Sequence, residues 1–223
     1  MSAIKQRSIG GLGVGVLLAA AMNIGSASAA DAHAMHDHSH HDHSAHQAML
    51  QQTSFVRSTA DYAIPDVALV DANGKAFSLR KAIEGDKPVL LNFIFTTCTT
   101  ICPVMSANFT KVQSELAAER GRFLMISISI DPDYDTPAKL KEYAARHGAG
   151  PDWHMLTGNR EEVLKVARAF DAWRGDKMNH SLITFLHAGA KQPWVRLDGL
   201  ATPADLVGEY RSLAKAPVAA QGS

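Results

Sequence analysis

The sequence has only two cysteines, Cys98 and Cys102, among its 223 residues. Two cysteines cannot form the multi-disulfide framework of a small secreted scaffold, but they can form one redox pair or part of a metal site. The chain also lacks an excess of charge, since 22 Lys and Arg residues balance 22 Asp and Glu residues. Binding to nucleic acid through phosphate neutralisation needs such an excess, so we expect no nucleic-acid partner. No apolar run reaches the roughly 18–20 residues of a convincing membrane span.

The composition of the chain is that of a globular protein. Apolar residues make up 46% and charged residues 20% of it, which excludes collagen-like, coiled-coil and wholly disordered chains. With roughly 60 N-terminal residues set aside, the remaining length fits one compact domain. We therefore expect four parts: a signal peptide at 1–30, a disordered His-rich arm and linker at 31–60, a folded domain at 61–215 and a flexible tail at 216–223.

The first 30 residues have the pattern of a cleavable secretory signal. Lys5 and Arg7 form a positive start, residues 9–24 are apolar but diluted by glycine, and Ala27-Ser28-Ala29 matches a cleavage site. The alternative is an uncleaved anchor helix, for which this glycine-rich stretch is short. No cysteine follows the apolar run, so we expect no lipid anchor. Export would take the chain into a compartment where its cysteine pair can be oxidised.

Histidine is concentrated in the segment that follows. This composition cannot form a core, so we expect the segment to be disordered without a ligand. A flexible array of imidazoles can bind Cu, Zn or Ni, and we expect a secondary metal site here. A purification tag and a polar spacer are the alternative interpretations. Seven of the eleven histidines in the chain lie in this segment: His33, His36, His38, His40, His41, His43 and His46.

Beyond residue 60, strand and helix patterns alternate along the chain. Apolar alternation around Asn73-Gly74 predicts a hairpin over 67–79. Alternating strands and helices favour an α/β protein. A late hairpin followed by a final helix favours a thioredoxin-like fold, with a mixed central sheet flanked by helices and an N-terminal hairpin. We expect strands at 88–95, 123–131, 153–156, 181–188 and 194–199, and helices at 103–116, 137–147, 160–173 and 203–215.

The motif that carries chemistry is TTCTTICP at 96–103, between a buried strand and a helix. Pro103 fits the first helical turn, because the amide hydrogen that proline lacks would be unpaired there anyway. Cys102 then lies near the positive end of the helix dipole, which we expect to favour its thiolate. The spacing lets the two sulfurs bind one Cu(I) or Zn ion, or form a disulfide. A purely structural disulfide is the alternative, but so short a loop gains little chain entropy.

His180 stands immediately before the strand expected at 181–188. In a thioredoxin-like sheet, the loop entering that strand lies beside the loop that bears the cysteines, so His180 can complete a site of two sulfurs and one nitrogen. A histidine before a strand is otherwise more often a satisfied polar residue. The remaining histidines, His147, His154 and His187, have no comparable placement, and we interpret them as structural or surface residues.

On these residues the chain resembles the Sco/SenC family of copper chaperones across most of residues 62–212. The marks are the strand followed by Cys98-x-x-x-Cys102-Pro103, the segment DPDYDTP at 131–137, and His180. The resemblance implies a thioredoxin-like fold and copper, as Cu(I) or Cu(II), bound by Cys98, Cys102 and His180. It further implies a periplasmic or membrane-facing protein that delivers copper to the dinuclear centre of cytochrome c oxidase. The expected partner is the copper-bearing subunit of that oxidase or another periplasmic copper chaperone.

The segment at 131–137 also has a physical interpretation of its own. Asp135-Thr136-Pro137 is typical of a helix cap, with proline near the first turn. Asp131 ends a strand at the face that carries the cysteines, so its carboxylate could instead support the metal ligands or face a partner.

The sequence thus predicts a monomeric metallochaperone rather than a dedicated enzyme. Reduced cysteines would bind copper, and a Cys98–Cys102 disulfide would remove two of the three ligands. The main alternative is a thiol–disulfide oxidoreductase that keeps the acceptor's cysteines reduced, which needs the same pair but not His180. A peroxiredoxin-like peroxidase is disfavoured, because Arg80 is the only arginine between residues 79 and 119 that could stabilise a bound peroxide.

Overall fold

A mixed β-sheet forms the centre of the protein. The computed structural model describes residues 55–189 and 192–215, and within them eight strands form one sheet in the order β1-β8-β7-β4-β5-β6-β2-β3. Strands β4, β5 and β6 run parallel, whereas the other neighbours pair antiparallel. The strands are β1 (Phe55–Ala60), β2 (Leu69–Asp71), β3 (Ala76–Phe77), β4 (Val89–Ile94), β5 (Leu124–Ser129), β6 (Trp153–Gly158), β7 (Ile183–His187) and β8 (Trp194–Gly199).

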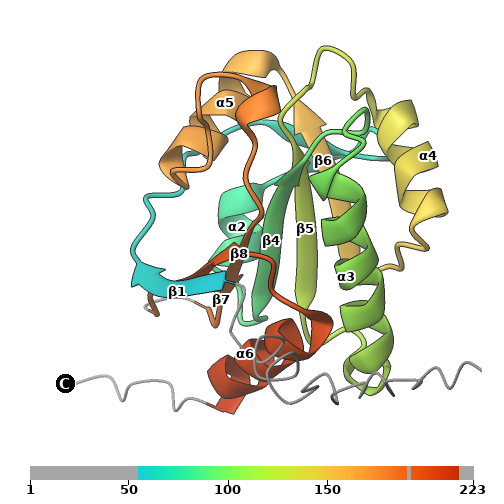
Figure 1. Cartoon of the computed structure of the whole chain (residues 1–223). Helices are drawn as coiled ribbons and strands as arrows, with labels where there is room; N and C mark the ends of the chain where they lie inside the picture. The colour runs from blue at the N-terminus through green and yellow to red at the C-terminus, as the bar shows by residue number, and fades with distance from the viewer. Residues whose placement is uncertain (1–54, 190–191, 216–223) are drawn as a thin grey trace, which may run out of the picture. The chain divides into compact units, whose positions relative to one another are not determined.

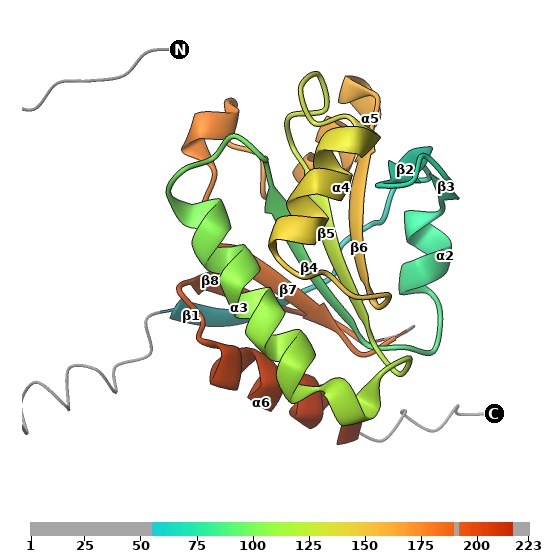
Figure 2. The same cartoon turned by 90° about the vertical axis from the view of Figure 1, so that its right-hand side faces the viewer.

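Helices cover both faces of this sheet, as Figures 1 and 2 show. Helices α3 (Ile101–Glu115), α4 (Pro137–Arg146) and α6 (Pro203–Lys215) lie on one face. Helices α2 (Leu79–Ile83) and α5 (Arg160–Ala169) lie on the other. Two 3-10 turns, η1 (Ala117–Glu119) and η2 (Lys177–Asn179), complete the described elements. The predicted α/β, thioredoxin-like architecture is confirmed.

Strand β4 is buried along its whole length, because helices cover both of its faces. Around it, the rings of Phe93, Phe170 and Phe185 pack together with centroids 5.1–6.0 Å apart. The predicted helix over 160–173 ends earlier, at Ala169, and the chain then turns through Asp171 at a φ of +49°. This packed core fixes the end of β4, where the cysteine motif begins.

The hairpin predicted around Asn73-Gly74 is confirmed. Strands β2 and β3 pair antiparallel, and Gly74 has a φ of +76°, which favours glycine. The Asp71 carboxylate accepts the amide N–H groups of Asn73 and Lys75 at 2.8 and 2.9 Å. These side-chain hydrogen bonds are typical of a turn that aspartate stabilises locally.

The sequence predicts a linker that extends to residue 60, but the last part of that segment is a strand in the structure. Residues 55–60 form the edge strand β1, which pairs with β8 over six residue positions. Arg57 on this strand makes two hydrogen bonds, of 2.8 and 3.1 Å, to the carboxylate of Glu209 on α6. The side chains of β1 are mostly exposed, so no alternating apolar pattern identifies the strand in the sequence.

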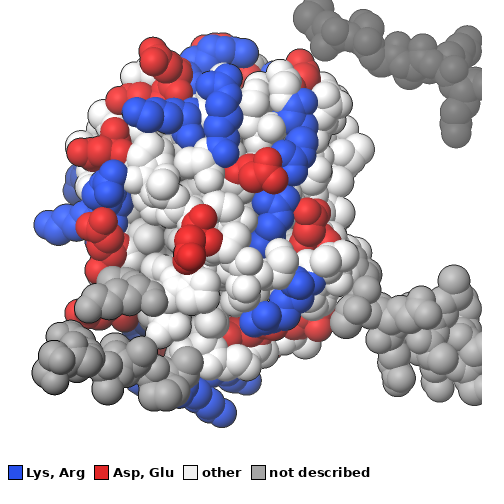
Figure 3. Space-filling view, turned by 90° about the vertical axis from the view of Figure 1, so that its left-hand side faces the viewer, with Lys and Arg blue, Asp and Glu red and all other residues white. Residues whose placement is uncertain are grey.

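Several predictions concern residues outside the described part of the chain. The signal peptide, the His-rich arm as far as residue 54 and the tail at 216–223 all lie there. Within residues 55–189 and 192–215, no helix is long and apolar enough to cross a membrane. Lys and Arg side chains are interspersed with Asp and Glu side chains on the face shown in Figure 3.

Candidate metal centre

Strand β4 leads directly into the turn that carries Cys98. The amide N–H of Cys98 donates to the carbonyl oxygen of Phe95 at 3.1 Å. Both cysteines are free; Cys98 is partly exposed, whereas Cys102, in the first turn of α3, is fully buried. The amide N–H of Cys102 points to Sγ of Cys98, with an N···S distance of 3.5 Å. The sulfur of Cys98 therefore accepts a hydrogen bond at the N-terminus of α3, as a helix-capping side chain does.

The two thiols ionise differently because their surroundings differ. Partial burial opposes ionisation of Cys98, but hydrogen bonds from the amides of Cys102 and Thr100 outweigh it and lower its pKa from 9.0 to about 7. Burial raises the pKa of Cys102 far above the ordinary value, and the neighbouring Cys98 thiolate and then the charge of Asp135 add to that rise. The prediction that Cys102 is the favoured thiolate is therefore wrong. The positive end of α3 stabilises the sulfur of Cys98 instead, because that sulfur faces the free amide groups of the first turn.

His180 follows the turn η2 and lies against the residue that begins the cysteine loop. The rings of His180 and Phe95 are in edge contact, with centroids 6.3 Å apart. Burial lowers the pKa of His180 to about 4, although a hydrogen bond with the backbone of Phe93 opposes the change. The ring nitrogen Nε2 is buried and has no hydrogen-bond partner. A neutral imidazole with one nitrogen fixed by a backbone group and the other unpaired is the form that binds metals.

The structure brings the three predicted ligands to one end of the sheet. Phe95 connects the cysteine loop to the histidine, because its carbonyl oxygen accepts the amide N–H of Cys98 and its ring contacts His180. They do not form a complete ligand set in this conformation. Over the described ranges, no three His, Cys, Asp or Glu side chains are grouped closely enough to hold a metal ion. The metal site at Cys98, Cys102 and His180 therefore stays a prediction.

Asp131 lies just past the end of β5 and is buried. Its carboxylate accepts a hydrogen bond from Nζ of Lys177 at 2.5 Å, and its amide N–H donates to Oγ of Ser129 at 3.0 Å. Lys177 is the first residue of η2, three positions before His180. In this conformation the carboxylate of Asp131 thus contacts the turn that carries His180, and a supporting role for Asp131 stays a prediction.

Asp135 has a different role from the helix cap that its sequence pattern predicts. Its fully buried carboxylate accepts the amide N–H of Thr96 at 3.0 Å, the hydroxyl of Ser129 at 2.6 Å, and the hydroxyl of Thr96. Thr136 alone caps α4, accepting the amide N–H of Lys139. The interpretation of Asp135 as a cap is therefore wrong. Asp135 instead ties the start of the cysteine loop to β5, and sequence spacing between residues 96 and 135 gives no signal of such a contact.

The histidines interpreted as structural or surface residues make local ring contacts. The ring centroid of His147 is 4.5 Å from that of Tyr143, and that of His154 is 5.1 Å from that of Phe77. His187 stacks on Trp194 at 4.5 Å. None of these contacts involves the cysteine loop. The seven histidines of the arm, His33, His36, His38, His40, His41, His43 and His46, lie outside the described residues.

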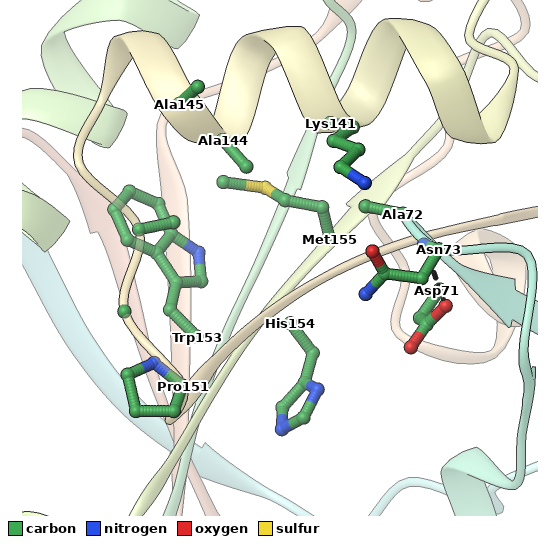
Figure 4. A pocket seen from close by; sticks show the side chains of 12 residues that line it. Asp71, Ala72, Asn73, Lys141, Ala144, Ala145, Pro151, Trp153, His154 and Met155 are labelled. Atoms are coloured by element: carbon green, nitrogen blue, oxygen red, sulfur yellow. Dashed lines mark hydrogen bonds between the residues drawn. The ribbon is translucent and has the colours of Figure 1, made fainter.

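Two surface pockets lie apart from the candidate centre. One, of about 370 Å³, lies between the N-terminal hairpin and α4; Lys141 and His154 are among its lining residues (Figure 4). The other, of about 690 Å³, includes Tyr62 and Trp194 in its lining. Neither pocket is lined by the cysteines or by His180, so neither belongs to this centre.

Comparison with known proteins gives consistent similarities. Residues 57–215 match the model of the SCO1/SenC family. A SCO1 protein homolog of Bacillus subtilis is 38% identical over 111 residues, which cover 49% of this chain and 56% of that protein. The chain spans somewhat more than half the length of the curated relatives that it matches first.

Two solved structures are similar over most of the described residues. One is BsSco, described as a member of the Sco family of cytochrome c oxidase assembly proteins with a disulfide switch. It is 30% identical to this chain, with a TM-score of 0.59, and the match covers 71% of this chain and 97% of that one. ScoI of Bradyrhizobium japonicum with copper bound is 25% identical, with a TM-score of 0.54 and coverage of 68% and 99%.

Proposed function

The chain belongs to the SCO1/SenC family, and we propose that it is a copper metallochaperone whose cargo is bound by Cys98, Cys102 and His180. One observation carries the proposal: the sulfur of Cys98 lies at the N-terminus of α3 beside a second free thiol, and His180, with an unpartnered Nε2, contacts the same loop through Phe95. Two thiolates and an imidazole are soft and borderline donors that suit copper. The copper-bound ScoI structure supports this choice of metal.

The same residues determine how the cargo is loaded and released. Copper entering at the surface meets Cys98 first, because Cys98 is partly exposed and its pKa of about 7 provides a thiolate at neutral pH. Binding to Cys102 then requires that thiol to release its proton, which the metal favours. Three protein ligands leave room for a donor atom of an acceptor, so copper passes by ligand exchange. Oxidation of the two thiols to a disulfide, with loss of two protons and two electrons to an oxidised dithiol partner, removes two ligands and stops loading.

We place this activity in the periplasm. The support is the signal-like pattern of residues 1–30 and a cysteine pair that an oxidising compartment would switch. The proposed acceptor is the dinuclear copper centre of cytochrome c oxidase, reached directly or through another copper chaperone. The description of BsSco as one of the cytochrome c oxidase assembly proteins supports that acceptor.

Copper analysis of site variants tests the proposed ligands. The chain from residue 31 onward, with its thiols reduced, should lose about one equivalent of Cu(I) when any one ligand is replaced, as expected for a single three-ligand site. The variants are Cys98→Ala, Cys102→Ala and His180→Ala. His154→Ala is the matched control, because His154 contacts Phe77 rather than the cysteine loop. An unchanged copper content in either cysteine variant would contradict the proposal.

The difference between the two thiols also favours a second function, thiol–disulfide exchange with an acceptor's cysteines. A partly exposed thiol of lowered pKa can attack a disulfide, and a neighbouring buried thiol of raised pKa can resolve the mixed disulfide. His180→Ala separates the two functions. If the cysteine pair acts as a reductant, the substitution should remove copper binding and leave disulfide exchange intact. If the variant keeps both activities, His180 is not a copper ligand.

A further inference from the structure

A partly buried ion pair connects the turn that carries His180 to the end of β5. Nζ of Lys177 is 2.5 Å from a carboxylate oxygen of Asp131, and the two side chains are 36% and 8% exposed. A second ion pair in the same region, Arg160–Asp133, is 58% and 64% exposed. Shielding from solvent makes the loss of one partner more costly for the first pair than for the second.

Lys177 contacts both His180 and its aromatic neighbour. The carbonyl oxygen of Lys177 accepts the amide N–H of His180 at 3.2 Å. Its ammonium nitrogen lies 5.6 Å from the centroid of the Phe95 ring, and the same ring is in edge contact with His180. Phe95 in turn accepts the amide N–H of Cys98. The ion pair, His180 and the cysteine loop thus form one continuous set of contacts.

The two ends of the ion pair are held to different degrees. The backbone around Asp131 is fixed, since its amide N–H donates to Ser129 and its carbonyl oxygen accepts the amides of Tyr134 and Asp135. By contrast, the other hydrogen bonds that residues 177–179 make in the described structure stay within segment 174–180. The hydrogen bond of His180 with the backbone of Phe93 holds the end of the turn, and the ion pair of the Lys177 side chain with Asp131 holds its beginning.

We propose that Asp131 and Lys177 are positioning residues for His180. Their ion pair holds η2 against the end of β5 and so keeps His180 beside Phe95 and the cysteine loop. Without the pair the turn takes up several positions, and copper binding must then restrict them, which weakens affinity. The inference rests on the proposed function, because it assigns its role through a copper ligand.

Two measurements on the chain from residue 31 onward test this role. In Lys177→Met and Asp131→Asn, the amides of Asn179 and His180 should exchange with solvent about tenfold faster in the copper-free protein, because the turn opens more often. Cu(I) affinity, measured with a competing chelator and reduced thiols, should fall about tenfold, the usual effect of removing a residue that orients a ligand. Both substitutions nearly preserve side-chain size, and Lys177 is partly exposed, so the fold should persist.

The controls separate a specific ion pair from a general loss of stability. Lys177→Arg keeps the charge and should retain the exchange rates, and Asp133→Asn, two residues from Asp131, should change neither measurement because its pair is exposed. The double variant should lose no more affinity than either single variant, since one interaction is removed in all three. Unchanged exchange, unchanged affinity, additive losses or an equal loss in Asp133→Asn would each overturn the proposal.

Failure of the proposed function would look different. If the unmodified chain binds no Cu(I) with its thiols reduced, copper delivery is wrong, yet amide exchange still tests how the ion pair holds the turn. If copper binds and is lost in His180→Ala but not in Lys177→Met, the proposed function stands and the positioning role is wrong.

Discussion

At the scale of single residues, the environments of the two cysteines assign them different chemistry. Cys98 is partly exposed and accepts an amide hydrogen bond from the first turn of α3, whereas Cys102 has no exposed surface. Ionisation places negative charge where hydrogen-bond donors are available, so it is favoured at Cys98 and opposed at Cys102. We therefore expect Cys98 to be the thiol that first meets copper or a disulfide partner.

The pH dependence of alkylation tests this difference. The pKa of Cys98 is lowered from 9.0 to about 7, so its thiolate forms at lower pH than an ordinary cysteine thiolate. In the reduced protein, the rate of reaction with iodoacetamide at Cys98 should reach half its maximum near pH 7, as followed by peptide mass spectrometry. Cys102→Ala is the control: it keeps the amide at residue 102, so the midpoint should stay well below 9.0. A midpoint near 9 in both proteins would contradict the assignment.

A second prediction concerns the carboxylate of Asp135. Asp135→Ala leaves the amide and hydroxyl of Thr96 and the hydroxyl of Ser129 without their acceptor. Burying such unsatisfied groups should lower the free energy of unfolding by about 3 kcal/mol. Removal of the neighbouring helix cap in Thr136→Ala should lower it by about 1 kcal/mol. Urea denaturation of the reduced proteins measures both, and equal losses would show that Asp135 is no more than a cap.

At the scale of secondary structure, elements with a strong local pattern were predictable. The apolar run of β4 and the Asn73-Gly74 hairpin both correspond to observed elements. Two elements lacked such a signal: α2 has only five residues, and β1 exposes most of its side chains. Both depend on contacts with distant parts of the chain, which periodicity within a short window does not report.

The same limit applies to the candidate site. The spacing of the cysteines and the position of His180 before β7 could be read from the sequence. The ionisation of the thiols could not, because it depends on burial and on which sulfur faces the amides of α3. The contacts of Lys177 with Asp131 span 46 residues, so they too appear only in the folded chain.

The edge strand β1 leads to a prediction about truncation. A chain that begins at residue 61 loses the pairing of β1 with β8 and the Arg57–Glu209 ion pair. Its free energy of unfolding should fall by roughly 2–4 kcal/mol relative to a chain that begins at residue 52, since each ladder hydrogen bond contributes about 1 kcal/mol and the freed chain regains entropy. The exposed edge of β8 should also promote self-association.

Urea denaturation and size-exclusion chromatography measure these two effects. The matched control is Arg57→Ala in the chain from residue 52, which removes the ion pair but keeps the strand. It should lose less than about 1 kcal/mol, because the arginine side chain is about half exposed to solvent. Identical denaturation of the two chain lengths would show that β1 adds no stability.

At the scale of the whole molecule, the chain contains two kinds of candidate metal ligand. The folded part offers two thiols and one imidazole at the end of the sheet, whereas seven of the eleven histidines precede residue 47. Thiolates favour Cu(I), and nitrogen ligands in a loose array accept Cu(II). An exported protein with both could collect Cu(II) through the N-terminal histidines and hold Cu(I) at the cysteine pair after reduction.

Copper stoichiometry in two chain lengths tests this division. A chain from residue 52 should bind about one Cu(I) when reduced and little Cu(II), since it keeps one three-ligand site. A chain from residue 31 should bind the same Cu(I) and additional Cu(II) with a nitrogen-ligand signature in electron paramagnetic resonance. Replacing the seven histidines by Asn in the longer chain should remove the additional Cu(II) and leave Cu(I) unchanged, whereas Cys98→Ala should do the reverse. If both lengths bind equal Cu(II), the arm is a spacer, because its histidines then contribute no metal site.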